Sequence, residues 1–411
     1  MSETSQTAEL KISDVVYRGQ GLARLDGRVI FVPGTAVGEK VLARMLKHHK
    51  NYSEARLVEV LEAAPERVAP ACRFALRSEG ADPCEYCPGC AYQHIAYGEE
   101  IRLKQAQFIN MMERIAGVDK AVIGPAVASA SELGYRNKIV LHGGGTQETP
   151  LLGYVAEDNK SIVDVPRCVL ARNEINDLLA RLRGDQPFMS SLVSSRRISL
   201  RHTPADGAVS WTGRSAENDP WLTDASAVGD MLVPRDSFAQ VNAGITGSLV
   251  ARVIELLKTN LPAALIDLYC GSGLFSFAAA QAGVTRIIGV DSDPSAVRAA
   301  QRNANVRGVN GCAFLARSAE AGLAEVLRSV NANAATIIVD PSRRGLEKGV
   351  VEQLGASKVS RIIYVSCAPD TMVRDVASLK RSGYSVSSAQ VMDMFPRTAY
   401  FESVTCLEVG R

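Results

Sequence analysis

The sequence predicts an α/β fold with a doubly wound parallel sheet in its C-terminal part, preceded by a small β-barrel and a small central α+β domain. From about Leu232 onward, apolar strand-like runs alternate with helical patterns, which is typical of a parallel sheet with helices on both faces. Residues 10–60 instead alternate short β-branched runs with glycines, as small barrels do. Between the two regions lies a loop rich in proline, glycine and cysteine that shows no amphipathic period.

The length and composition predict several soluble domains. A chain of 411 residues exceeds the size at which one hydrophobic core keeps growing. We place the barrel at 1–68, the central domain with its cysteine cluster at 69–231, and the doubly wound domain at 232–411. No apolar run approaches the roughly 20 residues that a membrane span needs, and the polar, acidic start lacks the features of a secretory signal. We therefore expect a cytoplasmic protein without membrane contact.

The formal net charge of +2 gives little long-range attraction for a polyanion, which argues against a protein that coats nucleic acid indiscriminately. One local basic stretch is present, with Tyr52 among its cations as a candidate stacking ring. Its basic residues are Lys40, Arg44, Lys47, His48, His49, Lys50 and Arg56. The stretch fits a local RNA contact and a solvated face equally well.

The barrel region contains Gly19-Gln20-Gly21-Leu22-Ala23 and, over residues 32–39, Val-Pro-Gly-Thr-Ala-Val-Gly-Glu. Through these segments it resembles the TRAM domain, an OB-like RNA-binding module. We expect five strands in this barrel, and the resemblance implies that it contacts RNA.

The first strand of the doubly wound domain, residues 265–269, ends in a glycine turn that contains Gly271 and Gly273. Glycines there let a ligand approach the backbone, at the place where open α/β sheets bind cofactors. The second strand, 287–290, ends in Asp291, which is placed to accept hydrogen bonds from ribose hydroxyls.

Two cofactor classes fit such a turn, a dinucleotide and S-adenosylmethionine (SAM). The third glycine of the dinucleotide pattern is absent, because Ser276 occupies its position. The carboxylate of Asp267, just before the turn, suits the cationic sulfonium and ammonium groups of SAM. The sequence thus favours SAM.

Reactive side chains follow three further strands. The strand 337–339 runs into Asp340 and Arg343, and the strand 362–365 runs into Cys367. A thiol at the carboxyl edge of a parallel sheet opens toward the active-site crevice, whereas a core cysteine would lie within the strand. Near the end of the sequence, Glu402 supplies another carboxylate.

These residues lie in segments that together resemble the uracil-5 RNA methyltransferase family over nearly the whole chain. The segments are Phe238-Ala239-Gln240-Val241-Asn242, Tyr364-Val365-Ser366-Cys367 with Pro369, Thr371, Arg374 and Asp375, and Asp393 to Glu402. In that family the cysteine is the nucleophile and the final glutamate the base. The resemblance implies these roles for Cys367 and Glu402, and it implies that Gln240 and Asp340 hold uracil and cofactor in a Rossmann-like methyltransferase domain.

The residue types suit this chemistry. Addition of the Cys367 thiolate to carbon 6 of uracil turns the ring into an enolate whose carbon 5 can accept a methyl group. Gln240 or Arg343 would stabilise the developing oxyanion, and Phe238 or Tyr269 would stack on a flipped base or on adenine unless they simply pack. The full set expected to contact the cofactor is Gln240, Asp267, Tyr269, Gly271, Gly273, Asp291 and Asp340.

Four positions depart from the family pattern. Ala368 stands where the family usually has asparagine, Ser342 replaces the second proline, Tyr400 replaces a histidine two residues before the base, and Asp291 replaces a glutamate. The nucleophile and the base are retained, so the departures concern the fine geometry or the substrate.

The cysteine loop carries Cys84, Cys87 and Cys90 at intervals of three, with Cys72 before them and Cys168 far downstream. In a reducing compartment, grouped cysteines bind metal more often than they form disulfides. Their spacing alone fits zinc as well as an iron–sulfur cluster.

The segments Pro88-Gly89-Cys90 and Gln93-His94 resemble the part of the same family that binds a [4Fe–4S] cluster. The resemblance implies Cys72, Cys87, Cys90 and Cys168 as ligands, with Cys84 as an alternate for Cys72.

The sequence as a whole therefore predicts SAM-dependent methylation of carbon 5 of a specific uridine in ribosomal or transfer RNA. Two alternatives stay open at this point: an iron–sulfur RNA-binding protein without turnover, and a methyltransferase that acts on another pyrimidine. RNA is the expected partner, and no feature demands an obligate protein partner.

Overall fold

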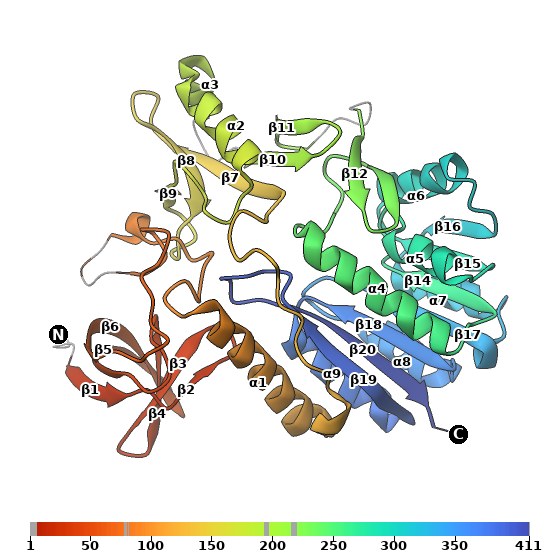
Figure 1. The fold of residues 1–411 in the computed structure, drawn as a ribbon, viewed down its shortest axis with the longest axis horizontal. Helices are drawn as coiled ribbons and strands as arrows, with labels where there is room; N and C mark the ends of the chain where they lie inside the picture. The colour runs from red at the N-terminus through yellow and green to blue at the C-terminus, as the bar shows by residue number, and fades with distance from the viewer. Residues whose placement is uncertain (1–5, 78–79, 81, 193–196, 215–219, 411) are drawn as a thin grey trace.

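The computed structural model describes the chain except residues 1–5, 78–79, 81, 193–196, 215–219 and 411. Figure 1 shows an N-terminal barrel, a central region built on a second sheet, and a large C-terminal sheet flanked by helices. Among the described residues, none of the helices has the length and apolar content that a membrane span requires.

The N-terminal barrel is a six-stranded sheet in the order β1-β5-β6-β4-β3-β2. Its strands are β1 (Thr7–Lys11), β2 (Asp14–Val16), β3 (Gln20–Leu25), β4 (Arg28–Pro33), β5 (Lys40–His48) and β6 (Tyr52–Glu62). There is one strand more than expected, because Ile12 and Ser13 separate the first segment into β1 and β2. Alternate residues of the strands, such as Ile30 and Val32 of β4, point into the barrel core.

The central region begins with the cysteine loop, which is irregular apart from the short 3-10 turn η1 (Pro83–Glu85). After α1 (Tyr97–Ala116) and η2 (Lys120–Val122), a five-stranded antiparallel sheet follows in the order β11-β10-β7-β8-β9. The remaining elements of this region are β7 (Lys138–Gly145), β8 (Pro150–Val155), β9 (Ile162–Asp164), α2 (Asn173–Gly184), α3 (Gln186–Ser190), β10 (Arg197–Thr203), β11 (Gly207–Thr212), β12 (Leu222–Ser226) and β13 (Gly229–Val233).

The C-terminal sheet has seven strands in the order β16-β15-β14-β17-β18-β20-β19. They are β14 (Ala264–Leu268), β15 (Ile287–Asp291), β16 (Cys312–Ala316), β17 (Ala335–Val339), β18 (Arg361–Ser366), β19 (Tyr384–Met392) and β20 (Glu402–Val409). The first five are parallel, and β20 pairs antiparallel with both β18 and β19. Every residue of β14 and β17 is buried, as expected for strands covered on both faces.

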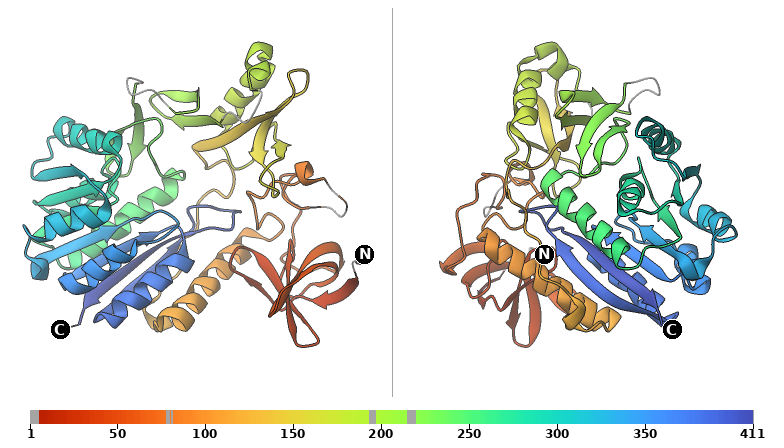
Figure 2. Two further views of the ribbon diagram at one scale, coloured as in Figure 1. Left: turned by 180° about the vertical axis from the view of Figure 1, so that it is seen from behind. Right: turned by 45° about the vertical axis from the view of Figure 1, so that its right-hand side comes forward.

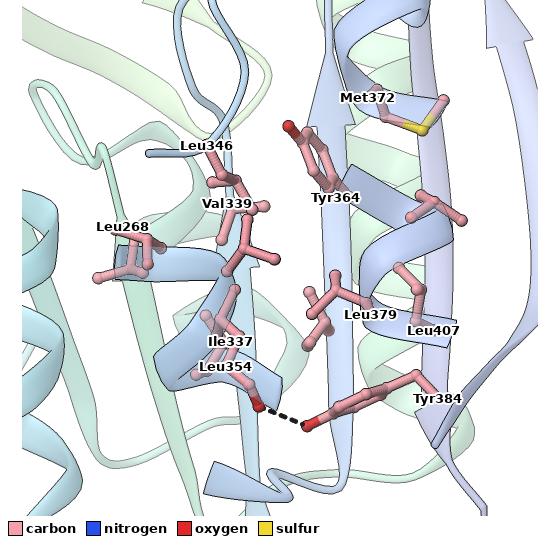
Figure 3. Close-up of a cluster of buried hydrophobic side chains, with 14 of the residues drawn as sticks. Leu268, Ile337, Val339, Leu346, Leu354, Tyr364, Met372, Leu379, Tyr384 and Leu407 are labelled. Carbon is pink, nitrogen blue, oxygen red and sulfur yellow. Dashed lines mark hydrogen bonds between the residues drawn. The ribbon is translucent and has the colours of Figure 1, made fainter. Parts of the chain in front are cut away.

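Helices cover both faces of this sheet, which confirms the predicted doubly wound class (Figure 2). They are α4 (Ala243–Thr259), α5 (Leu274–Ala282), α6 (Pro294–Val306), α7 (Ala319–Leu327), α8 (Lys348–Ser357) and α9 (Pro369–Arg381), with the 3-10 turn η3 (Ala332–Ala334) before β17. Asp293 caps α6: its side chain accepts a hydrogen bond from the backbone N–H of Ser295. One face packs against α4 and α5 and the other against α1, α7, α8 and α9. Figure 3 shows part of the hydrophobic core on the face covered by α1, α7, α8 and α9, where the Tyr384 hydroxyl donates to the Leu354 carbonyl at 3.2 Å.

Helix α1 crosses from the central region onto the C-terminal sheet and carries a buried lysine. Lys104 Nζ lies 2.7 Å from Glu100 Oε1 and 2.7 Å from Asp393 Oδ1, and the side chains of all three residues are fully buried. Arg397 Nη1 adds a second cation, 3.2 Å from Glu100 Oε2. The four charges join α1 to the 393–401 segment, which leads into β20.

Replacing this lysine should be costly. We expect Lys104→Met to lower the free energy of unfolding by roughly 3–5 kcal/mol, because it leaves buried carboxylates without their cation. The matched control is Lys348→Met, whose side chain is 91% exposed and which should change stability by less than about 0.5 kcal/mol. Urea unfolding of both variants measures the difference, and equal stabilities would contradict a structural role for the network.

Candidate active site

Asp267 lies buried near the carboxyl end of β14, behind the glycine turn. Its Oδ2 accepts a hydrogen bond from Ser276 Oγ at 2.6 Å, while Oδ1 has no partner among the described residues. Burial raises the pKa of Asp267 to about 7, and the hydrogen bonds from Ser276 oppose this rise only in part. The free oxygen is therefore an acceptor that a cationic or hydrogen-bonding ligand could satisfy.

The glycine turn adopts backbone angles that favour glycine. Gly271 and Gly273 have φ of 52° and 99°, and a Cβ on Gly273 would lie 2.7 Å from the Phe277 ring. Tyr269 shares the left-handed region with φ 65°, and its hydroxyl donates to Glu347. The backbone N–H of Gly271 donates to Asp291 Oδ2 at 2.9 Å, so the carboxylate expected to contact ribose also holds the turn.

A cavity of about 90 Å³ opens beside this turn. Its lining includes Phe238, Gln240, Tyr269, Gly271 and Asp340 from the predicted set, whereas Asp267, Gly273 and Asp291 are not among the lining residues. Gln240 Oε1 and Ser272 Oγ are buried and have no hydrogen-bond partner among the described residues. Together with Asp267 Oδ1, these unsatisfied atoms are consistent with a polar cofactor at this edge. Phe238 is 69% exposed, so its ring is available for stacking.

The register of the sheet places Cys367 opposite Glu402. The last residue of β18, Ser366, pairs with Ser403 of β20 in antiparallel register. Cys367, which follows Ser366, and Glu402, which precedes Ser403, therefore lie at the same end of this strand pair. Burial, together with the neighbouring charges of Glu402 and Asp340, raises the pKa of the Cys367 thiol to about 12. Arg343 opposes this rise by its charge and a hydrogen bond to the thiol.

The two carboxyl groups also hold their protons more tightly than usual. Burial raises the pKa of Glu402 well above its ordinary value, the charge of Asp340 raises it further, and Arg343 lowers it. Burial likewise raises the pKa of Asp340, assisted by Asp267. Glu402 Oε1 has no partner in the described parts of the chain. The structure thus gathers Cys367, Glu402 and Asp340, with the Arg343 guanidinium acting on Cys367 and Glu402.

Three contacts at this edge were not predicted from the sequence. The guanidinium of Arg343 lies over the ring of Tyr400, 3.8 Å from its centroid. Tyr17 packs edge-on against Phe401 at 6.1 Å between ring centroids, and Arg18 Nη2 lies 3.4 Å from Asp370 Oδ2 in the first turn of α9. The barrel therefore reaches the catalytic edge. The only signal in the sequence was the departure at Tyr400.

The departure at Ala368 removes a cap from the helix that follows the nucleophile. Ala368 is the N-cap of α9 and offers no side-chain acceptor to the first turn. Ser366 Oγ instead accepts a hydrogen bond from the Ala368 backbone N–H at 3.1 Å. The turn around Cys367 is thus stabilised by a side chain of β18, which precedes it, and not by a side chain at the N-cap of α9.

Four of the five predicted metal-binding cysteines influence one another electrostatically. Cys72, Cys87 and Cys168 each raise the pKa of Cys90, after burial, which is the largest cause and brings it to about 12. Cys84 lies apart from them, beside Asp82 and Asp158. Within the described ranges, no group of three or more histidine, cysteine, aspartate or glutamate side chains is arranged to hold a metal ion. The sulfur atoms are thus gathered in one region without forming a closed ligand set.

Two family models match separate parts of the chain. Residues 231–409 match the model described as tRNA (Uracil-5-)-methyltransferase, and residues 2–58 match the TRAM domain. These matches are to the same two families that the sequence resembles, the RNA uracil-5 methyltransferases and the TRAM domain. The family and enzyme class predicted from the sequence are thereby confirmed.

Individual relatives span the chain almost end to end. It is 29% identical to the 23S rRNA (uracil(1939)-C(5))-methyltransferase RlmD of Stenotrophomonas maltophilia over 97% of each chain. It is also 29% identical to the RlmD of Pseudomonas fluorescens, with 99% of this chain and 93% of the relative covered. The fold matches that of the Pyrococcus abyssi tRNA (uracil-54, C5)-methyltransferase solved with S-adenosyl-L-homocysteine, with a TM-score of 0.70 and 23% identity over 97% of this chain and 100% of that one.

The raised pKa of Cys367 predicts how the thiol reacts without substrate. We expect its alkylation rate by iodoacetamide to rise about tenfold per pH unit from about pH 7 to about pH 10, because the thiolate fraction grows in that proportion below the pKa. Arg343→Gln should slow the reaction at each pH by raising the pKa further. Mass spectrometry of the Cys367 peptide gives the rates, and a plateau below about pH 9 would show that the thiol is already activated.

Proposed function

We propose that the enzyme methylates carbon 5 of one uridine in ribosomal RNA through a covalent bond between Cys367 and carbon 6 of the base. The observation that carries this proposal is that Cys367, Glu402 and Asp340 influence one another's charges, and that Asp340 also lines the cavity next to the glycine turn. The named substrate of the two RlmD relatives supports ribosomal RNA. Transfer RNA is the second candidate, supported by the description of the matching family model.

SAM is the methyl donor in this proposal, and when bound it supplies an electrophilic methyl group. Gln240, Ser272 and Asp267 would hold it, because each offers a buried polar atom without a partner in the described structure. The cation of SAM would also offset the charge of Asp267 and favour its ionised form, whose pKa burial now raises. Gly271 would let the ligand approach the backbone, since a Cβ there would meet open space.

The chain's own residues act on the uracil ring in two stages. The Cys367 thiolate forms a bond to carbon 6, and the electron pair of the ring double bond moves onto the carbonyl oxygen, where Arg343 or Gln240 stabilises it. Once carbon 5 carries the methyl group, its proton passes to Glu402. The C6–S bond then breaks, its electron pair returns to Cys367, and the ring double bond reforms. A base with a pKa raised by burial suits removal of this weakly acidic proton.

Removing the base should trap the covalent complex. With SAM and unmodified RNA, we expect Glu402→Gln to form a protein–RNA complex that survives a denaturing gel and to release product about 10²- to 10⁴-fold more slowly than the parent. Cys367→Ser should form no such complex, with natural RNA or with 5-fluorouridine RNA.

The matched control is Glu255→Gln on the outer side of α4, where the carboxylate is 63% exposed, and it should retain the parent rate. Undiminished methylation by Cys367→Ser would rule out the covalent mechanism. A methyl group found on cytosine in the product RNA would instead indicate another pyrimidine as substrate.

We also propose that Cys72, Cys87, Cys90 and Cys168 bind a [4Fe–4S] cluster that orders the cysteine loop. The support is their donor chemistry and their mutual electrostatic influence. A second support is Arg136, whose charge acts on both Cys87 and Cys168 and would balance thiolates. Gln93 links two of the ligands, because its Nε2 donates to Cys90 Sγ at 3.1 Å and its Oε1 accepts from the Cys72 N–H at 3.0 Å.

The alternate cysteine provides the matched control for this proposal. Protein purified without oxygen should contain about four irons per chain. Cys72→Ser should lose most of that iron, whereas Cys84→Ser should keep it, since Cys84 lies apart from the other sulfurs. Iron and zinc analysis of the three proteins measures this, and zinc in place of iron, or iron loss from Cys84→Ser, would overturn the assignment.

A further inference from the structure

A second hollow, of about 250 Å³, lies outside the active-site cavity, between the barrel and the cysteine loop. The barrel contributes the turn after β2 together with parts of β4, β5 and β6 to its lining, and the cysteine loop contributes residues 75–77 and parts of 86–91. Ala399, from the segment before β20, completes it. No step of the proposed methyl transfer uses this hollow.

Three guanidiniums reach the hollow from three separate segments. They belong to Arg18 in the barrel turn, Arg56 on β6 and Arg77 in the cysteine loop. Two carboxylates stand against them: Glu157 in the lining, whose Oε2 lies 2.5 Å from Arg77 Nη1, and Asp370 outside the lining, whose Oδ2 lies 3.4 Å from Arg18 Nη2. The charge of the hollow is therefore positive although the chain as a whole is nearly neutral. Such a local excess of arginine is typical of a phosphate-binding surface.

The hollow also offers apolar and aromatic surface. Leu46 lines it and is 49% exposed, which is unusual for a leucine and leaves its side chain open to a ligand. Tyr86 and Pro88 line the side formed by the cysteine loop. Guanidinium groups beside apolar and aromatic side chains match the two parts of a nucleotide, its phosphate and its base.

The hollow adjoins the catalytic edge. Arg18, which lines it, pairs with Asp370 only three residues after Cys367. Ala399, also in the lining, precedes Tyr400, whose ring supports Arg343. A strand that delivers a base to Cys367 would therefore continue within reach of the hollow.

We propose that this hollow binds a nucleotide of the RNA substrate that neighbours the target uridine. Its phosphate lies against Arg18 and Arg56, and its base rests on Leu46 and Tyr86. The inference rests on the proposed function in one respect only, that RNA is the substrate. The basic stretch of β5 and β6 ends at this hollow through Arg56, so part of that stretch contacts RNA.

The salt dependence of RNA binding tests this inference. The probe is ribosomal RNA isolated from a strain that lacks the enzyme, bound to the full-length protein without SAM. Each lost phosphate contact should reduce the slope of log K against log salt by about one. We expect this for Arg18→Gln and for Arg56→Gln, and a reduction of about two for the double variant. Arg286→Gln is the matched control. Arg286 is exposed and lies just before β15, at the amino ends of the parallel strands, whereas Cys367 follows the carboxyl end of β18.

A second measurement locates the nucleobase that we place in the hollow. RNA that contains 4-thiouridine should crosslink under long-wavelength light to the peptides that carry Leu46 or Tyr86, and the double variant should lose these crosslinks. Unchanged slopes in the double variant, or crosslinks confined to other surfaces, would overturn the inference. The inference would also be overturned if uridine monophosphate abolished the crosslinks to Leu46 and Tyr86 at concentrations that leave the RNA bound to the protein. The hollow would then be a site for a free nucleotide.

Failure of this inference differs from failure of the proposed chemistry. The slopes need neither SAM nor Cys367, and they should be the same in Cys367→Ser. A normal covalent adduct with unchanged slopes would reject the nucleotide site alone. Reduced slopes without any adduct would reject the covalent mechanism alone.

Discussion

The active site depends on a buried ionic contact that lies outside it. Lys104 of α1 binds Asp393 and Glu100, and Arg397 binds Glu100 and the carbonyls of Tyr92 and Ile95. Charges removed from water are retained only where their partners are fixed, so this network holds the 393–401 segment in one conformation. The same segment carries Tyr400 and delivers Glu402 into β20. The end of the cysteine loop, α1 and the segment that leads to Glu402 are thus joined by one set of charges.

At the catalytic edge, burial works against the charged forms that the chemistry needs. Cys367, Glu402 and Asp340 all have raised pKa values, and Arg343 is the cation that opposes the rise for Cys367 and Glu402. Arg343 is itself exposed, so solvent weakens this effect. The Tyr400 ring holds the guanidinium beside the thiol, which gives the departure from the family histidine a physical role. Without substrate the thiol stays protonated, which protects it from stray electrophiles.

Local patterns in the sequence were enough to predict four of the seven strands of the C-terminal sheet, but not β16, β19 or β20. The apolar runs of β14, β15, β17 and β18, and the cap at Asp293, are set by residues close together in the chain. The docking of α1 on α9 and the approach of Tyr17 to Phe401 join residues hundreds of positions apart, and no periodicity reports such contacts. The surroundings of Cys84, with Asp82 and Asp158 instead of other cysteines acting on it, are likewise not encoded in the spacing of the cysteines.

The pairing of β18 with β20 has a consequence for how the enzyme tolerates change. Cys367 and Glu402 come together at one end of this strand pair because of its register, and that register is fixed by the buried side chains of β18 and of residues 402–407 of β20. A single residue added inside either strand would turn one of these two side chains to the opposite side of the sheet. The relative position of Cys367 and Glu402 therefore tolerates no change of length within β18 or β20.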